Sequence, residues 1–257
     1  MARRAWVLGV SAVGVVGAVL WLSGCGAVTK QFADDAKVEQ TIKSVLVASD
    51  SGSVKIRAGG TASVHREVHH NGDKPGATSR VDGDVLILDS CPVRNCWVDY
   101  DVVVPEGVTV SGRVDSGDVT VDGAKSVSLQ ASSGDVTVRK VTGTVNVEAN
   151  SGTVELVDIG DNIAVDADSG DVKALGIGGS ADIGASSGDI EVRLDKVGDV
   201  KARSNSGGVV VSVPTGSYKV VTDVDSGDLD CSIKSDETAA NTVDVQADSG
   251  NVSIGFS

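Results

Sequence analysis

Apolar and polar residues alternate along most of the chain, in short segments that meet at a Ser-Gly pair. Before the pair at Ser133, the apolar residues include Val127 and Leu129. After the same pair they are Val136 and Val138. Alternation with a period of two residues predicts β-strands that bury one face. Each unit is therefore expected to form a strand, a tight turn and a second strand.

Nine Ser-Gly pairs mark the turns of this pattern. They begin at Ser51, Ser116, Ser133, Ser151, Ser169, Ser187, Ser206, Ser226 and Ser249, and from Ser116 on the steps are 17, 18, 18, 18, 19, 20 and 23 residues. The residue before each pair is Asp, Asn or Ser. Those side chains cap turns by hydrogen bonds, and glycine tolerates the positive φ that a tight turn requires. We therefore expect positive φ at Gly134, Gly152 and Gly170.

A single strand-turn-strand unit cannot bury its own apolar face, so the units are expected to stack. The sequence predicts an all-β fold, a β-solenoid of stacked 17–23-residue strand-turn-strand coils. An antiparallel β-meander or prism of hairpins fits the same alternation. The outward column Glu155, Lys173, Glu191 favours the solenoid, because opposite charges are favourable on neighbouring parallel strands.

Regular repeats are expected over residues 114–257, and a less regular β region over residues 38–113. The second region is predicted to begin the sheets and to cap their N-terminal edge. Its expected strands are Ser44–Ala48, Val54–Arg57, Ser63–His70, Val85–Asp89, Trp97–Val104 and Val108–Val110, with a surface loop from Asn71 to Ser79.

Residues 1–24 have the features of a lipoprotein signal peptide. Arg3 and Arg4 precede an apolar run of 18 residues from Ala5 to Leu22. The run ends in Leu22-Ser23-Gly24-Cys25, which resembles a bacterial lipobox at all four positions. That resemblance implies that Cys25 is the lipidated first residue of the mature protein. An uncleaved transmembrane anchor is the alternative, and residues 25–37, which show no strand pattern, are expected to be a tether.

The charge of the chain excludes several classes of partner. With 22 Lys and Arg against 36 Asp and Glu, the formal net charge is -14. This balance argues against nucleic acid and against docking on anionic lipid through a basic patch. Only 3% of residues are aromatic, which also disfavours a sugar-processing cleft lined by aromatic rings.

Three cysteines remain if Cys25 carries lipid. Cys91 and Cys96 lie five residues apart between two expected strands, where a loop can bring their Cα atoms close enough for a disulfide. We predict that they are bonded. Cys231 aligns with inward-facing positions of other coils, such as Val138 and Val211, and is expected to be buried and reduced.

No catalytic residues, cofactor or metal site are predicted, because the motifs typical of hydrolases, metalloproteases and nucleotide-binding proteins do not occur. His65, His69 and His70 are expected to be surface or polar-face residues rather than a metal site. One open question is the acidic turn edge, which would bind either ordinary counterions or Ca²⁺. Its members are Asp118, Asp135, Asp171, Asp189 and Asp228.

The Ser-Gly-Asp-Val repeats and the segment Asp101–Val108 resemble the putative-adhesin family of bacterial envelope proteins, a domain of unknown function. The resemblance covers about Val38 to Ser257 and implies a β-solenoid with an envelope role and no established catalytic residues. The predicted function is that of a non-enzymatic lipoprotein on the extracytoplasmic face of the cell membrane. Its expected partners are a cell-wall polymer or an envelope protein. Two alternatives remain, a regulatory protein that contacts a membrane sensor and a polysaccharide-acting β-helix enzyme.

Overall fold

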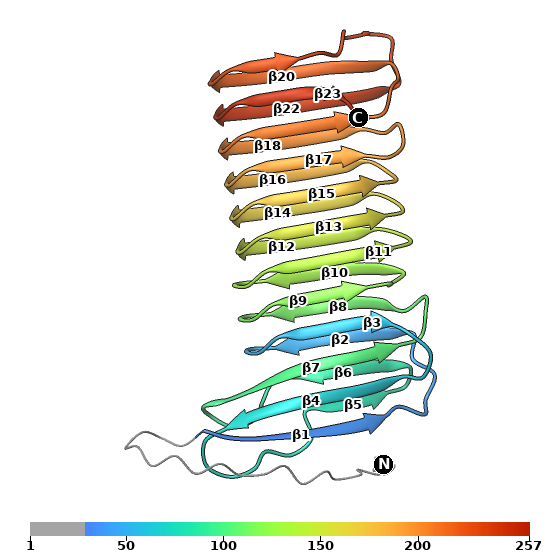
Figure 1. Cartoon of the computed structure of the whole chain (residues 1–257), viewed down its shortest axis with the longest axis vertical. Coiled ribbons are helices and arrows are strands. Elements are labelled where there is room, and N and C mark those ends of the chain that lie inside the picture. The colour runs from blue at the N-terminus through green and yellow to red at the C-terminus, as the bar shows by residue number, and fades with distance from the viewer. Residues whose placement is uncertain (1–28) are drawn as a thin grey trace, which may run out of the picture.

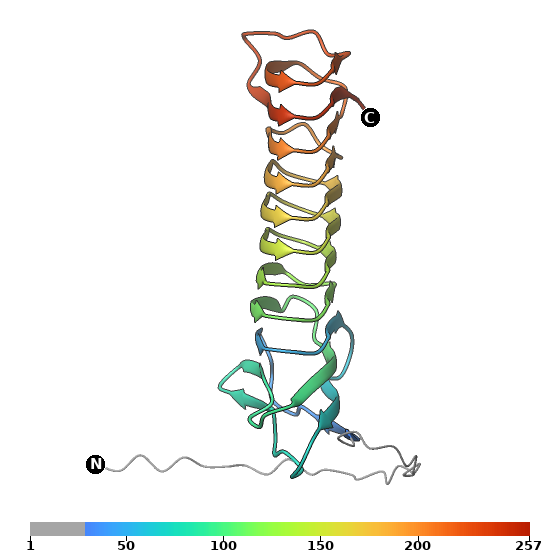
Figure 2. The same cartoon turned by 90° about the vertical axis from the view of Figure 1, so that its left-hand side faces the viewer.

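A computed structural model describes residues 29–257, so the signal segment and Cys25 lie outside the described residues. The described chain is a rod of stacked coils, each made of two strands that lie in two facing sheets (Figures 1 and 2). Most neighbouring strands are parallel, as a solenoid requires; within residues 29–257, only β1–β4, β4–β7 and β5–β6 are antiparallel. The predicted β-solenoid is confirmed, and the antiparallel meander or prism is wrong.

In the described part of the chain, one sheet has 12 strands and the other has 11. In spatial order, the 12-stranded sheet contains β1 (Lys30–Lys37), β4 (Ser63–His70), β7 (Cys96–Val104), β3 (Val54–Ala58), β9 (Val119–Asp122), β11 (Val136–Val141), β13 (Val154–Ile159), β15 (Val172–Ile177), β17 (Ile190–Leu194), β19 (Val209–Val213), β23 (Val252–Phe256) and β21 (Leu229–Cys231). The 11-stranded sheet contains β20 (Tyr218–Ser226), β22 (Asn241–Ser249), β18 (Val200–Ser206), β16 (Ala181–Ser187), β14 (Ile163–Ser169), β12 (Val145–Ser151), β10 (Ser126–Ala131), β8 (Thr109–Val114), β2 (Ser44–Ser49), β6 (Val85–Asp89) and β5 (Ser79–Asp82).

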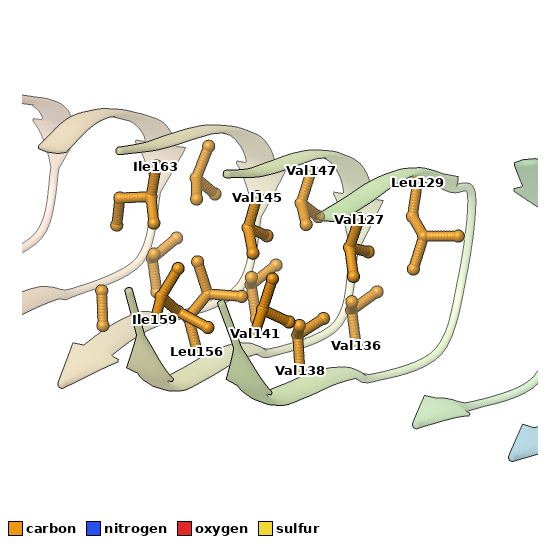
Figure 3. Close-up of a cluster of buried hydrophobic side chains, with 14 of the residues drawn as sticks. Val127, Leu129, Val136, Val138, Val141, Val145, Val147, Leu156, Ile159 and Ile163 are labelled. Atoms are coloured by element: carbon orange, nitrogen blue, oxygen red, sulfur yellow. The ribbon is translucent and has the colours of Figure 1, made fainter. Parts of the chain in front are cut away.

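The core fills the space between the two sheets with aliphatic side chains. Leu129 and Val147 from one sheet meet Val138 and Leu156 from the other (Figure 3). Val147, Val138 and Leu156 are fully buried. Because facing sheets lie only about 10 Å apart, Val, Ile, Leu and Ala fill the gap without large rings. This packing explains the low aromatic content of the chain.

The register between coils follows the repeat. Glu155 pairs with Lys173, and Lys173 pairs with Glu191, on neighbouring parallel strands. The Lys173 ammonium lies 3.3 Å from a carboxylate oxygen of Glu191. The charged column predicted from the sequence is therefore present on the outer face of the 12-stranded sheet.

At both ends of the rod the coils do not stack in chain order. After β18 and β19, the chain runs outward to the coil β20–β21 and then returns, so that β22–β23 lies between β18–β19 and β20–β21. At the other end, β2–β3 lies between β6–β7 and β8–β9. The last strand of the chain, β23, is therefore an interior strand, and Figure 1 shows the C-terminus below the end of the rod.

Residues 30–37 are not the strandless tether predicted from the sequence. They form β1, which pairs antiparallel with β4 along its whole length. Phe32 and Asp34 point toward the end of the core, where Phe32 packs against His70 and Asp34 pairs with Arg66. One of the inward positions of β1 is the charged residue Asp34. A pattern of alternating apolar residues therefore does not predict this strand.

Candidate functional site

The Ser-Gly turns align along the rod into a column of glycines. Gly134, Gly152 and Gly170 have φ values of 108°, 103° and 119°, which confirms the predicted positive φ. A second constraint was not visible in the sequence. A Cβ atom added at Gly152 would lie 2.6 Å from the carbonyl carbon of Gly134 in the preceding coil. The glycines are therefore required both by the turn and by the close approach of stacked backbones.

The turn aspartates form a hydrogen-bonded ladder along the same edge. The amide N–H of Asp135 donates to Asp118 Oδ1 at 3.0 Å, and the N–H of Asp189 donates to Asp171 Oδ1 at 2.9 Å. Where the Asp is missing, another side chain substitutes, since the N–H of Asp228 donates to Asn251 Oδ1. Each carboxylate or amide thus holds the turn of the adjacent coil.

This ladder gives the acidic turn edge a structural role. Among residues 29–257, no three His, Cys, Asp or Glu side chains lie close enough together to hold a metal ion. The carboxylates of Asp118, Asp135, Asp171 and Asp189 each use one oxygen to accept a backbone hydrogen bond. The arrangement of these four carboxylates matches turn capping.

The three histidines are divided between the two faces of β4. His65 and His69 lie on the outer face as expected, whereas His70 points inward and is buried, so the expected surface position is wrong for His70. His65 Nδ1 lies 2.7 Å from Asp35 Oδ1, whereas His69 Nε2 lies 3.4 Å from Asp99 Oδ2. The side chains therefore do not converge on one point, as the alternation along a strand predicts.

An aromatic pair on the outer face of this region was missed by the sequence analysis. The rings of His69 and Trp97 stack with centroids 4.7 Å apart and an interplanar angle of 6°. Glu67 and Asp99 flank His69, and Trp97 stays partly exposed. The signal was present in β7, where the inward positions Val98 and Tyr100 place Trp97 on the outside.

The N-terminal end of the core is closed by a partly buried polar network. The Arg66 guanidinium binds both carboxylate oxygens of Asp34, at 2.6 and 2.8 Å, and also donates to Gly76 O and Thr78 Oγ1. The hydrogen bond from Arg66 lowers the pKa of the Asp34 carboxyl. These contacts fix the predicted loop across the open end of the first coils.

Tyr100 completes this cap. Its hydroxyl lies 2.7 Å from the carbonyl oxygens of both Thr78 and Asp89. Burial raises the pKa of Tyr100 to about 12, although the hydrogen bond to Thr78 acts in the opposite direction. The neutral phenol is therefore strongly preferred in the folded protein.

The pKa of Tyr100 predicts a specific alkaline instability. Between about pH 10 and pH 12 the unfolded chain releases the phenolic proton while the folded protein keeps it, so stability falls as pH rises through this window. The variant Tyr100→Phe should lose about 1 kcal/mol at pH 8, because a buried hydrogen bond is removed. Between pH 8 and pH 11, the variant should lose less stability than the parent does. Urea unfolding at both pH values tests this, and parallel declines for parent and variant would contradict it.

The structure joins Cys91 and Cys96 in a disulfide with a Cα–Cα distance of 5.7 Å. Among the cysteines of residues 29–257, Cys231 is free, as predicted, but it is half-buried rather than buried. The reason is its place in β21, which is the last strand of the 12-stranded sheet and has a neighbour on one side only. Its inward register is still correct, since it packs against the edge of the core.

A shallow hollow on the outer face of the 11-stranded sheet is open to solvent. Leu46, Arg113, Gln130 and Glu148 contribute to its lining. Gln130 donates to Glu148 at 2.8 Å, so two of its polar side chains are already paired. Among the residues that the structure describes, its lining contains no His, Cys or Lys side chain.

The described chain thus defines a class of protein, a parallel β-solenoid capped at its N-terminal end by a polar network. Among residues 29–257, no helix has the length and apolarity needed to cross a membrane. The model of the Toastrack DUF4097 family matches residues 98–255, and the chain belongs to this family. This assignment confirms the resemblance found in the repeats.

A solved structure with a TM-score above 0.5 supports the same fold. A structure described as a putative adhesin from Bacteroides fragilis aligns with a TM-score of 0.52 at 13% identity, covering 91% of this chain and 100% of that chain. A structure described as a putative cell adhesion protein from Clostridium sporogenes aligns with a TM-score of 0.29 at 13% identity, covering 89% of this chain and 100% of that chain. No curated protein matches the chain.

Proposed function

We propose that this protein is a non-enzymatic rod, anchored through a lipidated Cys25 to the outer face of the cell membrane, that presents a binding surface to an envelope partner. The observation that carries the proposal is the position of β1, which begins at Lys30, five residues after Cys25. Five residues of extended chain span at most about 18 Å. A lipid on Cys25 would therefore hold the capped N-terminal end of the rod close to the membrane.

The opposite end would then project away from the lipid. Twelve strands at a spacing of about 4.8 Å give a stack about 50 Å long. The distribution of charge supports this orientation. Residues 26–113 carry 10 Lys and Arg against 12 Asp and Glu, whereas residues 114–257 carry 10 against 24. The strongly acidic repeats would be repelled by an anionic lipid surface, and the nearly neutral end would face it.

A binding role fits the remaining features better than catalysis does. The carboxylates that repeat along the turns are used to hold neighbouring coils, and the Bacteroides structure that shares the fold is described as a putative adhesin. A long, rigid, acidic rod is suited to recognising an extended envelope protein or a cell-wall polymer over part of its surface. The inward apolar columns serve stability, and the outer face and the far end remain available for binding.

Metabolic labelling with a fatty-acid probe tests the anchor. The full chain should incorporate the label and fractionate with membranes, whereas Cys25→Ala should lose the label and accumulate as precursor. The matched control is Cys231→Ala, which removes a thiol from the solenoid and should keep the label. Label that persists in Cys25→Ala would refute the lipid anchor.

Pull-down tests the binding role. In the same cells, pull-down of the labelled protein should recover a wall polymer or an envelope protein. Turnover of a glycan by the purified protein would refute the non-enzymatic role.

A further inference from the structure

The far end of the rod is formed by the coil β20–β21, and this end is incompletely covered. β20 is the last strand of the 11-stranded sheet, and β21 is the last strand of the 12-stranded sheet. Within residues 29–257, β20 pairs only with β22 and β21 pairs only with β23. Both strands therefore present a free backbone edge.

The hydrogen bonds around β20 show which backbone groups are free. Asp236 N–H donates to Tyr218 O at 2.9 Å, and Val220 N–H donates to Ser235 Oγ at 3.0 Å. The backbone N–H and C=O groups of Tyr218 and Val220 thus point away from β22, and the loop that follows β21 covers them. In a strand, alternate residues direct their N–H and C=O groups to the same side. The backbone N–H and C=O groups of Thr222 and Val224 must therefore also point away from β22. The described residues offer these groups no hydrogen-bond partner.

The apolar side chains at this end are exposed for the same reason. Leu229 is 46% exposed, whereas Val252 and Val209, which occupy the same position in the next two coils, are 1% and 0% exposed. Val224 is half-buried, but its neighbour Ala247 is buried. One more strand along this edge would cover Leu229 and Val224. The equivalent positions in the neighbouring inner coils are already buried.

The two ends of the rod differ in how completely the end of the core is covered. At the N-terminal end, the loop held by Arg66 and Tyr100 crosses the core. At the far end, Tyr218, Ile233 and their loop close only the side where β20 begins, because both of these residues are buried while Leu229 is not. The opening is therefore limited to the stretch from Thr222 to Cys231.

The charge of this stretch selects the kind of partner. Asp223, Asp225, Asp228 and Asp230 surround the free edge, and none of them forms an ion pair with another residue of the described chain, 29–257. An incoming strand would place its outward side chains beside Asp223 and Asp225, where basic residues are favourable. A second copy docked end to end would instead bring these carboxylates close to their own counterparts.

We infer that the free edge of β20 binds an extended segment of a partner protein in which basic and apolar residues alternate. The segment adds as a further strand, bonded to the backbone of Thr222 and Val224. Its apolar side chains cover Leu229 and Val224, and its basic side chains face Asp223 and Asp225. The inference deepens the proposed binding role, and it applies whether or not Cys25 carries a lipid.

The test uses residues 26–257, which contain every described strand, and a short fluorescent peptide of alternating Lys and Val. Anisotropy should show binding of this peptide and none of a peptide that alternates Glu and Val. Val224→Pro removes an outward N–H at an edge position that tolerates proline, and should weaken binding about tenfold or more. Alternate N-methylation of the peptide should have the same effect, and it leaves the protein unchanged.

A matched pair of variants separates strand addition from general attraction to an acidic rod. Asp223→Asn with Asp225→Asn should weaken binding, whereas Asp166→Asn with Asp168→Asn should not. The second pair has the same Asp-x-Asp-Ser-Gly context in an inner coil. Equal effects of the two pairs would overturn the inference, as would unaltered binding of the N-methylated peptide. A stable end-to-end dimer seen by sedimentation without peptide would also overturn it, because a second copy would then occupy the edge.

Discussion

Alanine at Gly152 should destabilise the solenoid by about 2–6 kcal/mol. Positive φ at a residue with a Cβ costs about 1–3 kcal/mol, and Gly152 has a φ of 103°. In addition, the new Cβ would lie 2.6 Å from the carbonyl carbon of Gly134, so the stacked backbones would have to move apart. Overpacking of this kind costs about 1–3 kcal/mol more. Urea unfolding of the purified domain measures the change.

Gly83 provides the matched control for this prediction. Its φ is 64°, but an added Cβ would have no heavy atom within 4 Å. Gly83→Ala should therefore show only the cost of backbone strain, about 1 kcal/mol. Equal losses of stability in the two variants would contradict the prediction. They would mean that the close approach of stacked backbones adds no cost and that turn geometry alone requires glycine at these positions.

Truncation after Gly250 should unfold the far end of the rod, although it removes only the last seven residues of the chain. These residues contain β23, which lies between β19 and β21 and buries Val252 and Ile254. Loss of the two buried side chains and of both backbone ladders should cost about 5 kcal/mol or more. Hydrogen exchange should then show lost protection in β20, β21 and β22, while the coils near β10 stay protected.

A pair of point variants gives the same test without truncation. Ile254→Ala should cost about 2–5 kcal/mol, because it leaves a cavity in the core. Leu229→Ala should cost less than about 1 kcal/mol, because Leu229 is 46% exposed. Stacking in chain order would give the reverse ranking, since β21 would then be interior and β23 would be the edge.

The regular part of the fold follows from local sequence signals. The 18-residue steps and the alternation of residues such as Val136 and Val138 determine which side chains enter the core, and the parallel register then follows from matching turns. The positive φ predicted for Gly134, Gly152 and Gly170 was correct. These features repeat in every coil, so each copy supports the interpretation of the others.

The departures from regularity depend on contacts between distant residues. Val252 and Leu229 follow the same local pattern, and nothing nearby shows that the chain returns to insert β23 beneath β21. β1 was missed because Asp34 occupies an inward position, which only its pairing with Arg66 makes favourable. The half-buried state of Cys231 has the same origin, since burial depends on which coil ends the rod. The open edge proposed for binding was likewise invisible before this topology was known.

Disulfide cross-linking of the outer column tests most directly which coil ends the rod, and therefore which strand is free to bind. In a Cys231→Ser background, Val210→Cys with Ser253→Cys should form a disulfide under mild oxidation. Val210 and Ser253 are paired on neighbouring strands, at a spacing of about 4.8 Å that a disulfide can span. Val210→Cys with Asp230→Cys should not cross-link, because β23 separates the two positions by about 10 Å. The opposite outcome, with Val210 bonded to residue 230 and not to residue 253, would contradict the inserted coil and the free edge of β20.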